Sequence, residues 1–400
     1  MSTIAIHLTL MQRQQHQQRQ QHERRPHRWT PLFACAIVMA TAAMLLGGCS
    51  TTPSAPRRAD APAASAPREP VASTNLRTPV QQQLIDDAAA LEPLATTALG
   101  RSFLRATEAL PSVATRIVYR DDNTRDYFSP DEAAAMPEDK RRKLATIELD
   151  EYRYYHTKYG SPLAYLRAID LAARNGLSDV SGAHILDFGY GAIGQLRLLA
   201  SLGAHVVGVD PDSYLDALYS QPSIDQGSVA TARNVYRGRR GSITLVHGLW
   251  PGTPELAQKV VKQAPYQLII SKNTLKRGYL KPERRAPKSQ LIELGVTDEQ
   301  FLNAVHANLA AGGLLVIYNL APKQAPPNKE FQPQADARSP FSAQQFARAG
   351  LDVVAMNTED HDFVRQMGLA LGWDKNSKGE VVNDLNSNLF ALYTIVRRAK

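Results

Sequence analysis

The chain has 400 residues, of which 44% are hydrophobic and 21% are charged, and its formal net charge is +8 at pH 7. Residues 1–28 carry five arginines against one glutamate and so hold +4 of this charge, which leaves +8 − 4 = +4 for the rest. The basic charge is therefore no argument for a nucleic-acid partner, and we expect none. Because the N-terminal part does not have a globular composition, we expect one main core rather than several domains.

An apolar run at 31–46 follows the basic segment and precedes two glycines and Cys49. A basic stretch, an apolar core and small residues are typical of a secretory signal. The letters LGGCS at 46–50 resemble the signal of bacterial lipoproteins. This resemblance implies that residues 1–48 are removed, that Cys49 is acylated, for example with palmitate, and that Ser50 directs the protein to the outer membrane, facing the periplasm.

Two alternatives stay open for this segment. Either the apolar run is an uncleaved helix in the inner membrane, or the start codon is mis-assigned, with Met11 as a later candidate, and the protein is cytoplasmic. If the signal is cleaved, Cys35 is removed with it and Cys49 is the only cysteine that remains. No disulfide, cysteine-based zinc site or cysteine nucleophile is then expected.

Residues 49–78 are rich in proline, alanine and serine and contain almost no large apolar residue. Such a composition predicts a disordered tether. A flexible chain of this length spans roughly 30 Å. The tether would hold a globular body just off a membrane.

Residues 79–160 predict an all-helical extension. The apolar spacing of 80–110 indicates two helices, interrupted at Pro93 and Gly100. A capping box at Ser129 begins another helix, and a further one is expected over 138–155. The extension ends in a segment with five tyrosines, and we expect this segment either to pack on the sheet or to form a lid in which Tyr155, His156 or Tyr159 touches a ligand.

The stretch 184–212 has the pattern of a strand, a glycine turn, a helix and a second strand. Glycines allow the turn to bring helix amides close to a ligand, and Asp210 at the tip of the second strand can accept hydrogen bonds from a ribose. We therefore expect an adenosine-containing cofactor. The letters GYGAIG alone also match the dinucleotide pattern of nicotinamide-binding folds, so an NAD(P)-dependent oxidoreductase is one alternative.

Asp187 favours the other possibility, because a carboxylate two residues before the first glycine suits a cofactor that has an amino group and no pyrophosphate. With this residue the segment resembles motif I of the class I S-adenosyl-L-methionine (SAM)-dependent methyltransferases, and the resemblance extends over roughly 160–398. It implies SAM as cofactor. It also implies cofactor contacts at a set of motif residues, namely Asp187, Gly189, Tyr190, Gly191, Asp210, His247 and Ser271.

Further strands are expected at 242–246, which ends before His247, and at 266–271, which ends at Ser271. The letters SKNTL there correspond to motif IV of the family, where methyl group and substrate meet. They lack the [DN]-P-P-[FY] signature, which disfavours amide and nucleobase substrates. Six basic residues at 276–288 form either a solvated loop or a clamp for an anionic substrate or lipid headgroup.

The remaining segments complete the expected fold. A capped helix, the pair Gly312 and Gly313 and a strand follow at 297–320, and the last strand, near the C-terminus, suits an antiparallel position. Residues 161–400 are thus predicted to form the Rossmann-like, seven-stranded α/β sheet of the class I methyltransferases. The cluster at 360–362 is interpreted as a polar turn rather than a metal site.

The resemblance implies methyl transfer from a sulfonium to a small-molecule acceptor that is unknown and possibly anionic. Lys272, Tyr279 and His361 are weak candidates for a general base, which only a high-pKa acceptor needs. Export stands against this function, because SAM is made and used in the cytosol. A non-catalytic, surface-tethered ligand-binding lipoprotein that reuses the fold is therefore a second alternative.

If Cys49 is acylated, the expressed protein should incorporate labelled fatty acid and fractionate with membranes. Cys49→Ser should abolish the label, because no other cysteine remains after cleavage, and a protein that begins at residue 78 should be soluble, since stable anchoring needs the acyl chains. A membrane-bound, full-length Cys49→Ser protein would show instead that the apolar run is an uncleaved helix.

Overall fold

The computed structural model describes residues 77–232 and 240–400. The predicted signal, Cys49 and nearly all of the tether lie outside these residues. Within the described part, no helix has the length and apolarity that crossing a membrane requires.

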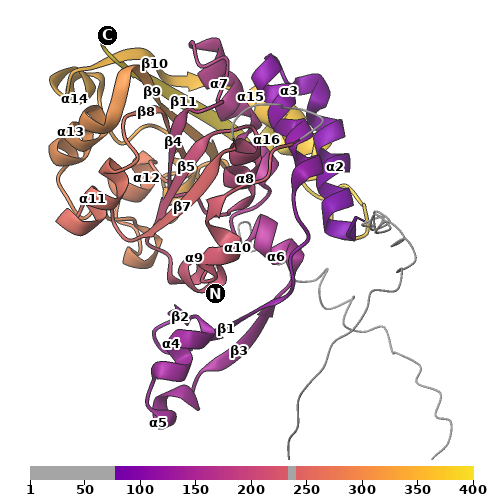
Figure 1. The fold of residues 1–400 in the computed structure, drawn as a ribbon. Helices are drawn as coiled ribbons and strands as arrows, with labels where there is room; N and C mark the ends of the chain where they lie inside the picture. Colours follow the sequence, from indigo (N-terminus) through magenta and orange to yellow (C-terminus); the bar gives the residue numbers. More distant parts are fainter. Residues whose placement is uncertain (1–76, 233–239) are drawn as a thin grey trace, which may run out of the picture. The chain divides into compact units, whose positions relative to one another are not determined.

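The described chain is organised around an eight-stranded sheet of order β10-β11-β9-β8-β4-β5-β7-β6 (Figure 1). Strands β4, β5, β7, β8 and β9 are parallel, and β11 is antiparallel to both β9 and β10. The strands are β4 (His184–Phe188), β5 (His205–Asp210), β6 (Gly227–Ser228), β7 (Ser242–His247), β8 (Tyr266–Lys272), β9 (Leu309–Ala321), β10 (Leu351–Glu359) and β11 (Phe390–Arg398). The predicted Rossmann-like α/β fold is confirmed, with the two-residue β6 added at the edge.

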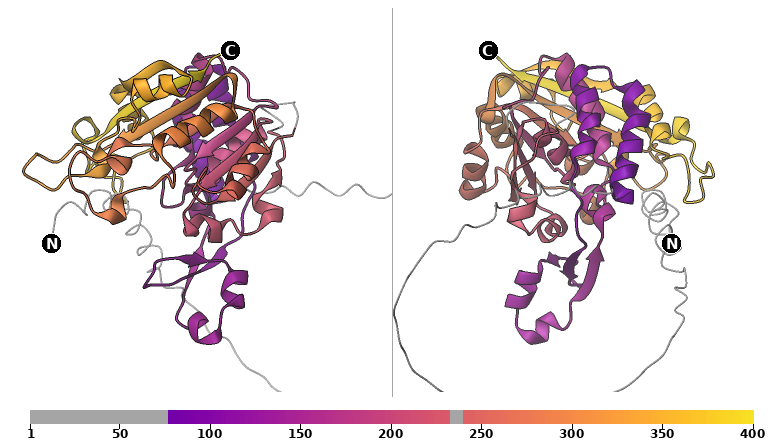
Figure 2. Two further views of the ribbon diagram at one scale, coloured as in Figure 1. Left: turned by 90° about the vertical axis from the view of Figure 1, so that its left-hand side faces the viewer. Right: turned by 45° about the vertical axis from the view of Figure 1, so that its right-hand side comes forward.

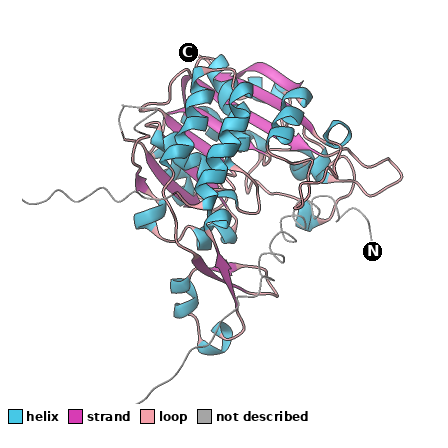
Figure 3. Cartoon of the chain, turned by 90° about the vertical axis from the view of Figure 1, so that its right-hand side faces the viewer, coloured by secondary structure: helices cyan, strands magenta, loops and turns pink. Residues whose placement is uncertain are grey.

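Helices cover both faces of this sheet (Figures 1 and 3). Neighbouring strand residues point to opposite faces, so Ile185 packs in one apolar cluster and Leu186 in the other. This explains why the parallel strands are continuous apolar runs. One face is covered by α7 (Leu166–Arg174), α8 (Gly194–Ser201) and α15 (His361–Ala370), the other by α11 (Pro254–Val261), α13 (Asp298–Asn308) and α14 (Ala343–Arg348).

The strand order reverses between β4 and β8. From β4 the chain continues to β5 and β7 on one side, whereas β8 and β9 lie on the other side. In open α/β sheets, ligands bind outside the carboxyl ends of the strands at such a switch point. The fold therefore brings the residues that follow β4, β5 and β8 to one edge of the sheet.

The extension begins with two helices, α2 (Pro79–Leu91) and α3 (Ala98–Arg105), as predicted. They are anchored by the fully buried Asp170 of α7, whose carboxylate accepts hydrogen bonds from the backbone N–H and the hydroxyl of both Thr96 and Thr97, at 2.5 to 3.2 Å. A Cβ at Gly100 would lie 2.1 Å from Asp170 Oδ1. The buried acid thus fixes the start of α3 against α7.

The prediction of an all-helical extension is wrong. A three-stranded sheet of order β2-β1-β3 follows α3 (Figure 2), and β3 (Ala145–Leu149) interrupts the helix predicted over 138–155. That stretch divides into α5 (Glu138–Arg141), β3 and α6 (Glu151–His156), because ATIEL pairs along its whole length with β1 (Arg116–Arg120). The remaining elements here are β2 (Tyr127–Phe128) and α4 (Pro130–Ala135), which begins at the predicted capping box of Ser129.

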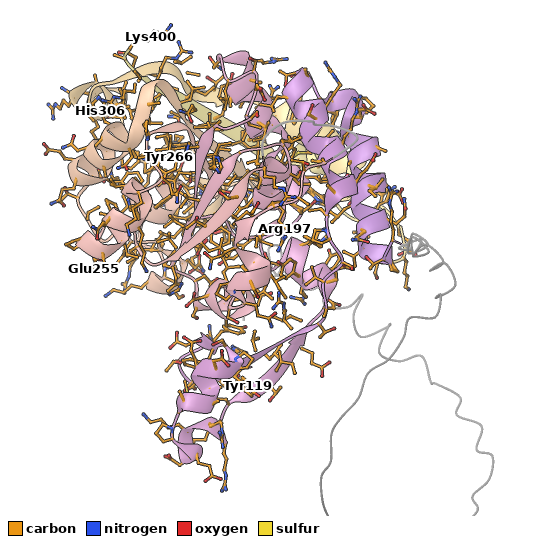
Figure 4. The ribbon with its side chains drawn as sticks, viewed as in Figure 1. Tyr119, Arg197, Glu255, Tyr266, His306 and Lys400 are labelled. Atoms are coloured by element: carbon orange, nitrogen blue, oxygen red, sulfur yellow. The ribbon has the colours of Figure 1, made fainter. Side chains whose placement is uncertain are left out.

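A buried polar network joins this small sheet to the main fold. Arg116 of β1 is ion-paired with Asp225 at 2.9 Å, and the same carboxylate oxygen accepts a hydrogen bond from the Tyr154 hydroxyl at 2.7 Å. Arg197 of α8, labelled in Figure 4, donates to the Tyr154 hydroxyl oxygen at 2.7 Å. All four side chains are buried, so the network holds the base of β1 against α8.

Asp170→Asn should lower the free energy of unfolding although the side chain keeps its shape, because the amide group places N–H donors against the donors of one threonine. We expect a loss of about 1 to 3 kcal/mol, the usual cost of leaving buried polar groups unsatisfied. Urea denaturation should show this, with the exposed Asp352→Asn as control, within about 0.5 kcal/mol of the wild type. Equal stabilities of the two variants would contradict the anchoring role.

Candidate functional site

The turn after β4 is formed by glycines in the left-handed region, Gly189 at φ +75° and Gly191 at φ +60°. The backbone N–H of Gly189 donates to the carbonyl of Val209 at 2.8 Å, so the turn is held against the end of β5. A Cβ at Gly189 would lie 2.1 Å from Thr274 Oγ1. The loops that follow β4 and β8 are therefore in contact at the switch point, and only glycine fits there.

Asp210 is the last residue of β5 and is 9% exposed. Its Oδ2 accepts a hydrogen bond from the Gly191 N–H at 3.3 Å, and its Oδ1 accepts one from the Asp212 N–H at 3.0 Å. Burial raises the pKa of Asp210 to about 6. Each oxygen has a second lone pair, so the carboxylate can still accept hydrogen bonds from a ligand.

Asp187, on β4, is 1% exposed. Its Oδ2 accepts a hydrogen bond from Gln195 Nε2 at 3.0 Å, and its Oδ1 accepts one from the Tyr165 hydroxyl at 3.3 Å. Burial raises the pKa of this carboxyl to about 7, against the effects of these donors and of the nearby Lys272. The Oε1 atom of Gln195 is buried and has no hydrogen-bond partner among the described residues.

Lys272 is the last residue of β8 and is 9% exposed. Its Nζ lies 5.3 Å from the centre of the Tyr165 ring, and within 77–232 and 240–400 it makes no hydrogen bond or ion pair. Burial lowers the pKa of Lys272 to about 8, although the neighbouring Asp187 acts in the opposite direction. The structure thus places a lysine without an acceptor beside a buried acid.

A covering segment, residues 157–160, lies across the glycine turn. Thr157, at φ +52°, donates its hydroxyl to the carbonyl of Gly191 at 2.7 Å. Lys158 is ion-paired with Asp212 at 2.5 Å, and the Tyr159 hydroxyl donates to the same carboxylate. A Cβ at Gly191 would lie 3.1 Å from the Tyr159 ring. Side chains of this segment therefore cover part of the turn.

The segment with five tyrosines accordingly has two parts, one that packs in the interior and one that lies at the glycine turn. Tyr155 and His156 are buried, and the Tyr155 hydroxyl donates to the Pro111 carbonyl, so these two pack in the interior rather than reach the turn. Tyr159, at 49% exposed, is the one of the three predicted lid residues that lies at the turn.

Other predicted site residues divide between the sheet edge and the interior. His247 is exposed at the end of β7, in register with Asp210. In contrast, the predicted cofactor contacts by the side chains of Tyr190 and Ser271 are not supported. Tyr190 is buried against Gly208, and Ser271 is fully buried, with its Oγ accepting from the Leu275 N–H at 3.2 Å.

The other two candidate bases are Tyr279 and His361. Tyr279 lies on α12 (Arg277–Leu280), and burial raises its pKa to about 12, so it keeps its proton at neutral pH. His361 is the first residue of α15, and its Nδ1 faces the Ala391 carbonyl at 3.0 Å. Of the three, Lys272 is the one at the switch point.

The basic residues at 276–288 mostly have partners inside the protein. Lys276 donates to the carbonyls of Leu320 and Gln334, and Arg277 is ion-paired with Glu283 at 3.1 Å. Lys281 pairs with Asp298, and Arg284 donates to the Pro327 carbonyl at 2.7 Å. These contacts favour a structural loop over a clamp.

Sequence reasoning missed the residues that hold the two acids in place. Gln195 and Tyr165 donate to Asp187, and Lys158 neutralises Asp212, two residues after Asp210. The position of Gln195 in the first turn of the helix after the glycines was a usable signal, because that turn lies beside the end of the preceding strand.

No family model and no curated protein matches the chain. Among solved structures, it is similar to a SAM-dependent methyltransferase from Geobacter sulfurreducens in complex with S-adenosyl-L-homocysteine, at 18% identity over 56% of this chain and 88% of that one, with a TM-score of 0.31. A SAM-dependent methyltransferase from Thiobacillus denitrificans, also in complex with S-adenosyl-L-homocysteine, is 14% identical over 59% and 90%, with a TM-score of 0.31. Magnesium protoporphyrin IX methyltransferase from Synechocystis PCC 6803 with bound SAM is 13% identical over 60% and 79%, with a TM-score of 0.28.

Gly189→Ala should destabilise the protein by about 2 to 4 kcal/mol, because it combines a strained backbone with the clash against Thr274. Gly182→Ala is a matched control, since Gly182 has φ +70° and a Cβ there would meet nothing within 4 Å. We expect about 1 kcal/mol for the control. Thermal or urea unfolding measures both, and a similar loss in the two variants would show that the loops after β4 and β8 are not in contact.

Proposed function

We propose that this chain is a SAM-dependent methyltransferase whose ligands bind at the switch point of the sheet. The observation that carries the proposal is the pair of buried acids, Asp187 and Asp210, at the ends of neighbouring strands on either side of a glycine turn. Asp210 keeps free lone pairs for ribose hydroxyls, and the turn allows a close approach of the backbone. Their side-chain chemistry fits a nucleoside that carries an amino group.

The cofactor, when bound, would supply an activated methyl group, so the task of the protein is to align the reactants and exclude water. Asp210 would orient the ribose. Lys272 has a pKa of about 8, so at neutral pH it is mostly charged and donates hydrogen bonds, while its neutral fraction can act as a base. We infer that the methyl acceptor is a small molecule, which needs a base only where its nucleophile has a high pKa.

The cellular setting is also a proposal. We propose that Cys49 carries the lipid anchor and that the domain is tethered to the envelope membrane by residues 49–78, which rests on the sequence pattern at 46–50. The acceptor would then be a molecule that reaches this compartment.

A non-catalytic ligand-binding protein is the second candidate. It is supported by the side chains of Tyr159 and Thr274, which lie against the two glycines of the turn. Such a protein would bind the nucleoside and transfer no methyl group. An oxidoreductase is less well supported, because a buried acid at Asp187 opposes a pyrophosphate at the turn.

Asp210→Ala should weaken binding of SAM and S-adenosyl-L-homocysteine about tenfold or more, because a hydrogen bond to a charged group contributes roughly 1.5 to 3 kcal/mol. Isothermal titration calorimetry measures this, with Asp352→Ala, an exposed acid on the edge strand β10, as the matched control. Unchanged affinity in a folded Asp210→Ala protein would remove this residue from the site. Binding of NAD without binding of either sulfur compound would overturn the proposed function.

A further inference from the structure

We propose that a cavity between the small sheet and the main fold binds a small organic carboxylate, which Arg116 recognises. None of the residues that line this cavity belongs to the set assigned to the nucleoside, so the proposal does not depend on the proposed function.

The cavity lies at the base of the small sheet. This sheet extends from the main fold together with α4 (Figure 2), and a cavity of about 200 Å³ lies where the two parts meet. One wall comes from β1 and the first residue of α4, and the other from the end of α9 (Ser213–Leu218) and the residues that follow it. Ile117 and Pro130 are exposed members of this lining, so a ligand can enter from solvent.

The first argument is a charge imbalance in the buried network beside the cavity. The network contains the guanidinium groups of Arg116 and Arg197 and the carboxylate of Asp225, and these side chains are between 1% and 6% exposed. No second acid among the described residues pairs with either guanidinium group, so one positive charge is left over. Buried charges are costly unless they are paired. An anion in the cavity would supply the missing negative charge.

The second argument is the state of the Arg116 guanidinium, which is part of the cavity lining. Its Nη2 donates to Asp225 Oδ1 at 2.9 Å, whereas its Nη1 is buried and has no hydrogen-bond partner among the described residues. Asp225 is already engaged elsewhere, because its Oδ1 also accepts from the Tyr154 hydroxyl and its Oδ2 accepts from the Gln221 N–H at 3.0 Å. Guanidinium donors match the geometry of a carboxylate well. Arg116 therefore retains a charged donor for a second carboxylate.

The third argument is the remaining lining, which is largely apolar. Ile117 and Pro130 contribute from one wall, and Ala217 and Leu218 from the other. An inorganic phosphate would turn several oxygens toward these walls without donors, whereas a carboxylate with a short apolar body suits both parts of the cavity. Pockets for drug-sized ligands begin at about 300 Å³, so this cavity fits a smaller molecule.

The test is a ligand-observed NMR titration of the full chain with butyrate as probe and butyramide, its neutral isostere, for comparison. The wild type should bind butyrate about tenfold or more tightly than butyramide, because only butyrate can form charge-assisted hydrogen bonds with Arg116. Arg116→Met should abolish this preference, and Arg116→Lys should retain part of it. Arg348→Met, at an exposed arginine of α14, is the matched control and should change neither affinity.

A second variant leaves the buried network intact, since Arg116→Met also removes a partner of Asp225. Ser220 lines the cavity and takes no part in this network, so Ser220→Leu should narrow the cavity without disturbing the ion pair. It should weaken butyrate and butyramide alike, by about tenfold, because the added side chain occupies the space of the ligand body. Circular dichroism verifies that each variant is folded.

Three results would overturn the inference. The first is a wild type that binds butyrate no more tightly than butyramide, and the second is an unchanged butyrate affinity in Ser220→Leu. The third is tighter binding of inorganic phosphate than of butyrate, which would reject an organic carboxylate as the ligand class. No nucleoside enters these titrations, so each of these results leaves the proposed function to its own test.

Discussion

A carboxylate can be buried only where hydrogen-bond donors surround it, and the carboxyl edge of this sheet is built around two such groups. Asp210 takes backbone N–H groups from the glycine turn and from Asp212, and Asp187 takes side-chain donors from Gln195 and Tyr165. The turn, the first turn of α8 and the start of α7 are therefore positioned by the need to satisfy two acids. The same need limits how these elements can move, because each displacement would expose a buried oxygen without a donor.

The sequence predicted best those parts of the fold that depend on local patterns. The apolar strands, the glycine turn and the capped helix starts at Ser129 and Thr297 are confirmed, since each is encoded within a few residues. The sheet of β1 and β3 was missed because its strands pair over more than twenty residues of intervening chain, and 138–155 alone is compatible with a helix. In β3, the pairing with β1 therefore outweighs the local helical pattern.

The candidate site also combines features that the sequence predicted with contacts that it could not predict. The positions of Asp187 and Asp210 follow from the motif, whereas the directions of side chains do not. Tyr190 and Ser271 occupy motif positions, yet one packs on Gly208 and the other caps its own loop. The isolation of Lys272 could not be read from the sequence either, because it depends on which groups the fold brings near the end of β8, whereas Lys276 finds the carbonyls of Leu320 and Gln334.

Thr157 holds a backbone conformation, φ +52° and ψ −163°, that is almost reserved for glycine. A β-branched residue there costs of order 1 to 3 kcal/mol, which its hydrogen bond to Gly191 and the contacts of Lys158 and Tyr159 with Asp212 must offset. The strained backbone of the covering segment is thus held in place by its contacts with Gly191 and Asp212. Breaking the contacts with Asp212 also lets the strained backbone of Thr157 relax. The release of this strain offsets part of the free energy needed to uncover the turn.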